Sequence, residues 1–187
     1  MDFLASHLTG DDVVYIDIGA NSGLYVQWLA AKMVPSSRAI AIEPHPALCE
    51  RMRRNLSMLR EAGIETRVDI VECAAGDQER TLKLDGDLGT GSLALGGKGG
   101  IPVRVQPLNE ILKQLSCSKI SALKIDVEGY EDRALIPFLQ TAPRQLWPNA
   151  ICMEFVNSDL WKEDAIAELI RQGYRPVGKR TAISSWN

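Results

Sequence analysis

The chain has 187 residues, of which 45% are hydrophobic and 24% are charged, a composition typical of a globular protein with one domain over residues 1–187. The formal net charge of -3 gives no electrostatic basis for binding nucleic acid or an anionic membrane surface. No signal peptide or membrane-spanning run is visible, so we expect a cytoplasmic protein without membrane insertion.

Short apolar, β-branched runs alternate with segments of helical period along the chain. This alternation predicts an α/β fold with a mostly parallel central sheet and helices on both faces. We expect strands at residues 13–18, 39–43, 66–73, 122–127 and 150–155, helices at residues 23–33 and 46–63, and a strand running into a helix over residues 101–115.

The first predicted strand ends in Asp17 and leads into a turn that contains Gly19 and Gly23. Such a turn brings the backbone close to a nucleotide in doubly wound folds, but the dinucleotide fingerprint needs a glycine where this chain has Asn21. The Asp17 carboxylate would also repel a pyrophosphate, whereas it would attract an ammonium group and a positive sulfur. The turn therefore indicates S-adenosylmethionine as the cofactor.

The second predicted strand also ends in an acid, Glu43, which Pro44 follows. A carboxylate at this point is placed to accept hydrogen bonds from both hydroxyls of a ribose, which supports the same cofactor. The alternative is that Asp17 and Glu43 only cap the helices that follow them.

Residues 86–100 interrupt the alternation and hold seven of the fifteen glycines. A segment so rich in glycine is too flexible to form a core element. It is either an inert surface loop or a lid over a site, and the sequence leaves both open.

The fourth predicted strand carries three charges, Lys124, Asp126 and Glu128, at alternate positions, which puts them on one face if the chain is extended. A central parallel strand is covered on both sides, so these charges either form a buried ion pair or line a cleft at the strand's carboxyl end. Gly129 favours the cleft because it allows a sharp exit from the strand.

A positioned carboxylate or imidazole can act as a general base by removing the proton of an acceptor group. Asp126 and Glu128 are the first candidates for this role, and Glu154 and His45 are the second.

The four cysteines form no C-x-x-C pair and no His and carboxylate cluster has ligand spacing, so we expect reduced cysteines and no metal. Trp161 and Trp186 are either core residues or a platform for a sugar ring.

The motifs "IDIGANSGLY", "AIEPHP", "ECAAGD" and "LKIDVEGYE" resemble the FkbM family of methyltransferases over about residues 13–175. The resemblance implies the Rossmann-like class I methyltransferase fold and O-methylation of a sugar, glycan or natural product with S-adenosylmethionine. It also implies roles for several residues. Asp17, Gly19, Asn21 and Gly23 would hold the methionine end, Glu43 the ribose and the neighbourhood of Cys73 and Ala74 the adenine, and Asp126 would face the reacting methyl group. We also expect Pro44 to bind the cofactor, and Asp126 and Glu128 to be the catalytic residues. Asn109 departs from the family pattern, which usually has Asp there.

Three alternatives remain open. The first is a methyltransferase of another family that has the same cofactor site and acts on nitrogen or on another small molecule. The second is a non-catalytic binding module that keeps the cofactor pocket but has lost the acceptor site. An NAD(P)-dependent oxidoreductase is disfavoured by Asp17 and Asn21. The expected partner is a small-molecule or glycan acceptor, and either residues 86–100 or a second subunit of a homo-oligomer would close the site.

Overall fold

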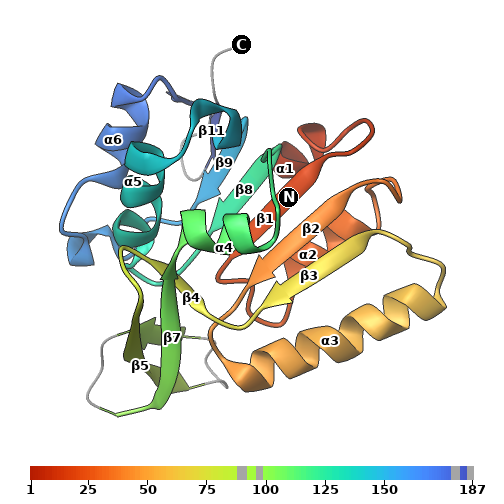
Figure 1. Cartoon of the computed structure of the whole chain (residues 1–187), viewed down its shortest axis with the longest axis horizontal. Coiled ribbons are helices and arrows are strands. Elements are labelled where there is room, and N and C mark those ends of the chain that lie inside the picture. Colours follow the sequence, from red (N-terminus) through yellow and green to blue (C-terminus); the bar gives the residue numbers. More distant parts are fainter. Residues whose placement is uncertain (88–91, 96–98, 178–181, 185–187) are drawn as a thin grey trace.

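A computed structural model describes residues 1–87, 92–95, 99–177 and 182–184 of the chain. Figure 1 shows two sheets, a large one with helices on both sides and a smaller one beside it. The large sheet has the strand order β10-β11-β9-β8-β1-β2-β3 and the small sheet the order β4-β7-β5-β6. The strands are β1 (Val14–Ile18), β2 (Arg38–Ile42), β3 (Arg67–Val71), β4 (Ala74–Gly76), β5 (Arg80–Asp87), β6 (Ser92–Leu95), β7 (Ile101–Pro107), β8 (Ala122–Ile125), β9 (Ala150–Met153), β10 (Arg175–Pro176) and β11 (Ala182–Ser184).

The five strands predicted from the sequence form the parallel part of the large sheet, which confirms the predicted fold class. The remaining two strands, β10 and β11, are antiparallel and follow β9 at one edge. The helices are α1 (Asp2–Ser6), α2 (Leu24–Ala30), α3 (Pro46–Glu61), α4 (Leu108–Gln114), α5 (Glu131–Thr141) and α6 (Ala165–Arg171), and single 3-10 turns lie at Arg144–Leu146 and Ser158–Leu160.

The helices divide between the two faces according to the side chains that alternate along the strands. On one face, bulky residues such as Ile16, Leu123 and Ile151 pack with residues of α4, α5 and α6. On the other, smaller residues such as Ala41 and Ala122 pack with α1, α2 and α3. Because both faces are covered, β1 is buried along its whole length, as a central parallel strand must be.

Of the small sheet, the sequence pattern predicted only β7, the strand that runs into helix α4 within residues 101–115. The expected strand 66–73 ends at Val71, and residues after it enter the small sheet as β4, which pairs with β7. Part of the glycine-rich segment is also regular, because β5 pairs with β6 in this sheet. Residues 88–91 and 96–98 of that segment lie outside the described residues, so its role as a lid stays a prediction.

Two other expectations concern the whole chain. All four cysteines are free, and Cys49 and Cys73 are buried, as expected for reduced structural thiols. Within the ranges that the structure describes, no helix combines the length and apolar character needed to cross a membrane.

Candidate active site

A cavity of about 290 Å³ lies at the carboxyl ends of β1, β2 and β8. In open α/β sheets this is the edge where ligands bind. Side chains and backbone from these strand ends and from the small sheet line it together, namely Ile18, Gly19, Ala20, Asn21, Ser22, Leu24, Tyr25, Ile42, Glu43, Pro44, Cys73, Ala74, Ala75, Leu84, Lys124, Asp126, Val127 and Glu128.

The turn after β1 requires glycine at two positions. Gly19 has φ +77°, and a Cβ atom there would lie 1.9 Å from the carbonyl oxygen of Asp126. Gly23 has φ +83°, and its Cβ would lie 2.5 Å from Cγ of Met52. Both the left-handed backbone and the close contacts exclude a side chain, so the turn can pass tightly between the ends of β1 and β8.

Glu43 is 3% exposed and joins the loops that follow β1 and β2. Its two carboxylate oxygens accept hydrogen bonds from the backbone N–H groups of Asn21 and His45, each at 2.8 Å. Burial raises the pKa of Glu43, and the two backbone hydrogen bonds oppose that shift by stabilising the charged form. The carboxylate is therefore held in place at the wall of the cavity.

Neither predicted acid caps a helix, so the capping alternative was wrong. The N-cap of α2 is Gly23, with no side-chain hydrogen bond. The N-cap of α3 is His45, whose side chain accepts a hydrogen bond from the backbone N–H of Ala47. His45 is not among the residues that line the cavity.

Asp17 lies behind the cavity wall and is 1% exposed. The register of the parallel pair β1 and β8 places Asp17 opposite Lys124, and the Lys124 Nζ is 3.3 Å from Asp17 Oδ1 and 3.2 Å from Asp126 Oδ2. Burial raises the pKa of the Asp17 carboxyl, and the Lys124 ammonium offsets part of that shift. For Lys124 itself burial disfavours the charge, but the two ion pairs outweigh it and raise the pKa. The predicted Lys-Asp pair is thus present, and the same lysine also reaches the cavity.

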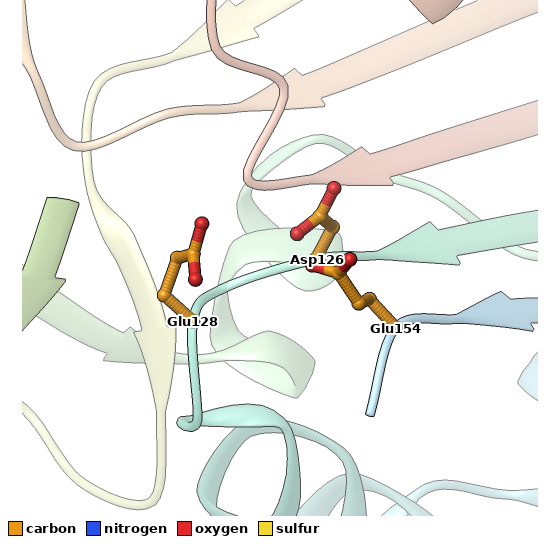
Figure 2. A group of neighbouring side chains, drawn as sticks. All are labelled: Asp126, Glu128 and Glu154. Atoms are coloured by element: carbon orange, nitrogen blue, oxygen red, sulfur yellow. The ribbon is translucent and has the colours of Figure 1, made fainter. Parts of the chain in front are cut away.

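Three carboxylates gather at the ends of β8 and β9, although Glu154 is far from the other two in sequence. Asp126, Glu128 and Glu154 each place one oxygen within 4.8 Å of the others. Figure 2 shows Asp126 and Glu154 with their carboxyl groups side by side, while Glu128 comes from the loop beyond β8. Carboxylates at this spacing can share a proton or surround a cation, and spacing along the sequence gave no sign of the cluster.

Glu128 does not continue the strand, contrary to the predicted alternation of three charges on one extended face. The strand ends at Ile125, and Glu128 has φ +53°, a left-handed conformation that is uncommon for a residue other than glycine. Gly129, with φ +89°, then makes the sharp exit that was expected. A turn rather than strand alternation therefore brings Glu128 to the cavity.

A hydrogen-bond network from α5 and the segment after β9 holds this turn. Glu131 accepts hydrogen bonds from the backbone N–H groups of Val127 and Gly129, and the Trp161 Nε1–H donates to it at 2.7 Å. The Asn157 amide donates to Glu128 at 2.7 Å. Trp161 therefore supports the turn from behind, while Trp186 lies outside the described residues.

The residues present fit S-adenosylmethionine in three respects. The glycine turn leaves a close backbone approach that a Cβ would fill. The buried Glu43 carboxylate is presented at the cavity wall, where it can accept hydrogen bonds from hydroxyl groups. Three acids, Glu43, Asp126 and Glu128, line the cavity with the single Lys124 ammonium, so the cavity favours a positively charged group.

Of the residues predicted to bind the cofactor, Gly19, Asn21, Glu43, Pro44 and Ala74 line the cavity, and so do both predicted catalytic acids. Asp17 and Gly23 do not line it, because they support the turn and the lysine from behind. Asn109 lies on α4, where its amide donates a hydrogen bond to Thr141.

Tyr25 and Leu84 line the cavity but were not predicted. Tyr25 occupies the first turn of the helix after the glycine turn, a position from which it could have been inferred, and the Lys124 Nζ lies 5.1 Å from the centre of its ring. Leu84 comes from β5 of the small sheet, which the sequence pattern did not indicate.

Several solved structures share this fold. The methyltransferase FkbM from Methylobacillus flagellatus KT superposes with a TM-score of 0.59 at 16% identity, covering 94% of this chain and 44% of that one. This chain therefore spans less than half the length of that protein. The precorrin-6y C5,15-methyltransferase from Geobacter metallireducens GS-15 gives a TM-score of 0.57 at 17% identity, with 100% and 86% of the two chains covered. No curated protein matches the sequence.

At these identities the solved structures establish the fold alone. The family model of the methyltransferase FkbM domain, however, matches residues 17–176, which begin at the acid of the glycine turn and extend to the end of β10. That range contains the whole cavity lining and all three clustered carboxylates. The chain belongs to the FkbM family of methyltransferases.

Proposed function

We propose that this protein transfers a methyl group from S-adenosylmethionine to a hydroxyl oxygen on a sugar, glycan or natural product. The observation that carries the proposal is the meeting of the glycine turn, Glu43 and the acids Asp126 and Glu128 around one cavity, with Glu154 close to both acids. Binding groups and candidate bases face the same space, which is the arrangement a group-transfer enzyme needs.

The residues on the β1 and β2 side of the cavity would hold the cofactor. Gly19 and Asn21 in the turn would face its methionine end, and Glu43 would accept hydrogen bonds from its ribose hydroxyls. Cys73 and Ala74 would form the wall against adenine, and Pro44 lines the cavity next to Glu43. Asp17 would act through Lys124, because it is buried behind that side chain.

The bound cofactor supplies a methyl group on a positively charged sulfur. The acids on the β8 and β9 side would act on the acceptor. Asp126 borders the cavity next to Lys124, and Glu128 is held from the other side by Asn157. In the proposed reaction Asp126 and Glu128 position the acceptor hydroxyl, and a carboxylate of this group of acids removes its proton, a contribution of about a hundred to ten-thousandfold in rate.

Calorimetric titration with S-adenosylhomocysteine, with NAD as the control ligand, tests the cofactor assignment. We expect binding of S-adenosylhomocysteine alone, and binding of NAD alone would overturn the proposal. At about a hundred times the dissociation constant, the bound ligand should add about 2.7 kcal/mol to the free energy of unfolding, which a thermal shift would detect.

Transfer of labelled methyl from S-adenosylmethionine to a panel of sugars, glycans and hydroxylated natural products, with amines as controls, tests the acceptor class. The Asp126→Asn and Glu128→Gln variants should still bind S-adenosylhomocysteine but lose most of the turnover, by about a hundredfold or more. Label found on nitrogen instead of oxygen would contradict O-methylation, and unchanged turnover in both variants would remove these acids from the mechanism.

A further inference from the structure

Glu154 lies at the end of β9, where the parallel ladder with β8 continues for one residue beyond both strands. Its backbone N–H donates to the carbonyl of Ile125 at 3.0 Å, which places Glu154 beside Asp126. Figure 2 shows the two carboxyl groups close together. The backbone ladder thus brings Glu154, which is not itself a lining residue, to within 4.8 Å of the cavity-lining acids Asp126 and Glu128.

The charged neighbours of Asp126 and Glu154 differ. On one side the Lys124 ammonium lies 3.2 Å from Asp126 Oδ2, while no described Lys or Arg forms an ion pair with Glu154. The charges that act most strongly on Glu154 are the acids Asp126, Glu128 and, from α5, Glu131. A hydrogen bond to Asp126, followed by burial and by repulsion from these acids, raises the pKa of Glu154 to about 7.

A single proton can hold such a pair together, since two carboxylates in contact cannot both ionise freely. Because the ammonium lies against Asp126, the proton of the pair belongs on Glu154. A carboxylate that keeps its proton up to about pH 7 is a stronger base, once ionised, than an ordinary carboxylate. Glu154 is also only half-buried, so its carboxyl group can release a proton to solvent.

We propose that Glu154, once it has lost the proton that it shares with Asp126 to solvent, is the general base that takes the proton of the acceptor hydroxyl. This inference rests on the proposed methyl transfer to oxygen. The acceptor oxygen gains the methyl group as the carbon–sulfur bond breaks, the electron pair of that bond stays on sulfur, and the hydroxyl proton moves to a Glu154 carboxylate oxygen. Asp126 orients Glu154, and Lys124 keeps the pair asymmetric.

The protonation of Glu154 can be measured without any acceptor. In the protein with 13C-labelled glutamate side chains, in the presence of EDTA, NMR should show one carboxyl that titrates near pH 7 and disappears in Glu154→Gln. The matched control Glu163→Gln, which changes an exposed glutamate outside the group of three acids, should leave that signal in place. A Glu154 signal that titrates near 4.5 would overturn the proposal.

Stability gives a second readout. The folded-state pKa of Glu154 is raised from 4.5 to about 7, so its contribution to stability is present below about pH 4.5 and is lost as the pH rises through about 7. The free energy of unfolding should therefore fall between these pH values by more in the wild-type protein than in Glu154→Gln. Equal pH dependence in both proteins would count against the shared proton.

Turnover separates a catalytic role from a structural one. With the acceptor found in the labelled-methyl panel, kcat/KM should rise as one proton is lost near pH 7, and Glu154→Gln should lower it by about a hundredfold and abolish the inflection. An inflection that persists in Glu154→Gln would overturn the proposal. Binding of S-adenosylhomocysteine should be the same in the wild-type protein and in Glu154→Gln. If neither protein binds it, the proposed function fails; if both bind it and the inflection persists in Glu154→Gln, only the role of Glu154 fails.

Discussion

The acids in and beside the cavity fall into a buried layer and a half-buried layer. In the buried layer, Asp17 is paired with Lys124 and Glu43 accepts two backbone hydrogen bonds. In the half-buried layer, carboxylate oxygens of Asp126, Glu128 and Glu154 lie within 4.8 Å of one another. The comparison indicates that buried acids with a partner stabilise the structure of the site. Acids that lie close to one another repel, and this repulsion shifts their proton affinities into a range suited to proton transfer.

Removing the partner from the buried layer should have the largest effect. Lys124→Met would leave the Asp17 carboxylate buried and unpaired, and we expect it to lower the free energy of unfolding by about 3–5 kcal/mol. Chemical denaturation measures this loss. The double variant Asp17→Asn/Lys124→Met should recover most of it, and Lys113→Met on the exposed surface of α4 should change it by less than about 0.5 kcal/mol. A small effect of Lys124→Met would mean that the pair does not organise the buried layer.

Moving the two layers apart should have the next largest effect. Gly19→Ala puts a Cβ atom 1.9 Å from the Asp126 carbonyl oxygen, so the turn must move away from β8. We expect a loss of about 2–4 kcal/mol in the free energy of unfolding and at least a hundredfold weaker binding of S-adenosylhomocysteine.

Gly63→Ala is the matched control for that change. Gly63 has φ +85°, close to the value at Gly19, but no atom lies within 4 Å of its Cβ position. Its substitution should cost only about 1–2 kcal/mol from backbone strain and should leave binding unchanged. Equal binding losses in both variants would show that strain, rather than the contact with Asp126, explains the effect.

Changing the half-buried layer should have the smallest effect on stability. Glu128→Gln removes a charge but can still accept the hydrogen bond from Asn157, and we expect the free energy of unfolding to change by less than about 0.5 kcal/mol at pH 7. Burial and the nearby Asp126 raise the pKa of Glu128, so loss of its charge relieves repulsion. A loss of more than about 2 kcal/mol would place Glu128 among the structural acids and would weaken the distinction between the layers.

Much of the fold could be predicted because it depends on local patterns. The five parallel strands follow from apolar runs, and the glycine turn follows from two glycines near an acid at a strand end. Apart from β7, the small sheet could not be predicted, because β4 has only three residues and pairs with β7, far along the chain. The position of Leu84 in the cavity depends on that pairing.

The sequence by itself determined the fold class, the tight turn at Gly19 and the placement of acids at strand ends, because these depend on side-chain periodicity and on the freedom of glycine at positive φ. Only the tertiary structure decided what each acid does. Strand register sets Asp17 opposite Lys124, and the β8–β9 ladder sets Glu154 against Asp126. The charge state of a carboxyl group depends on the neighbours within a few ångströms, and folding brings those neighbours from distant parts of the chain.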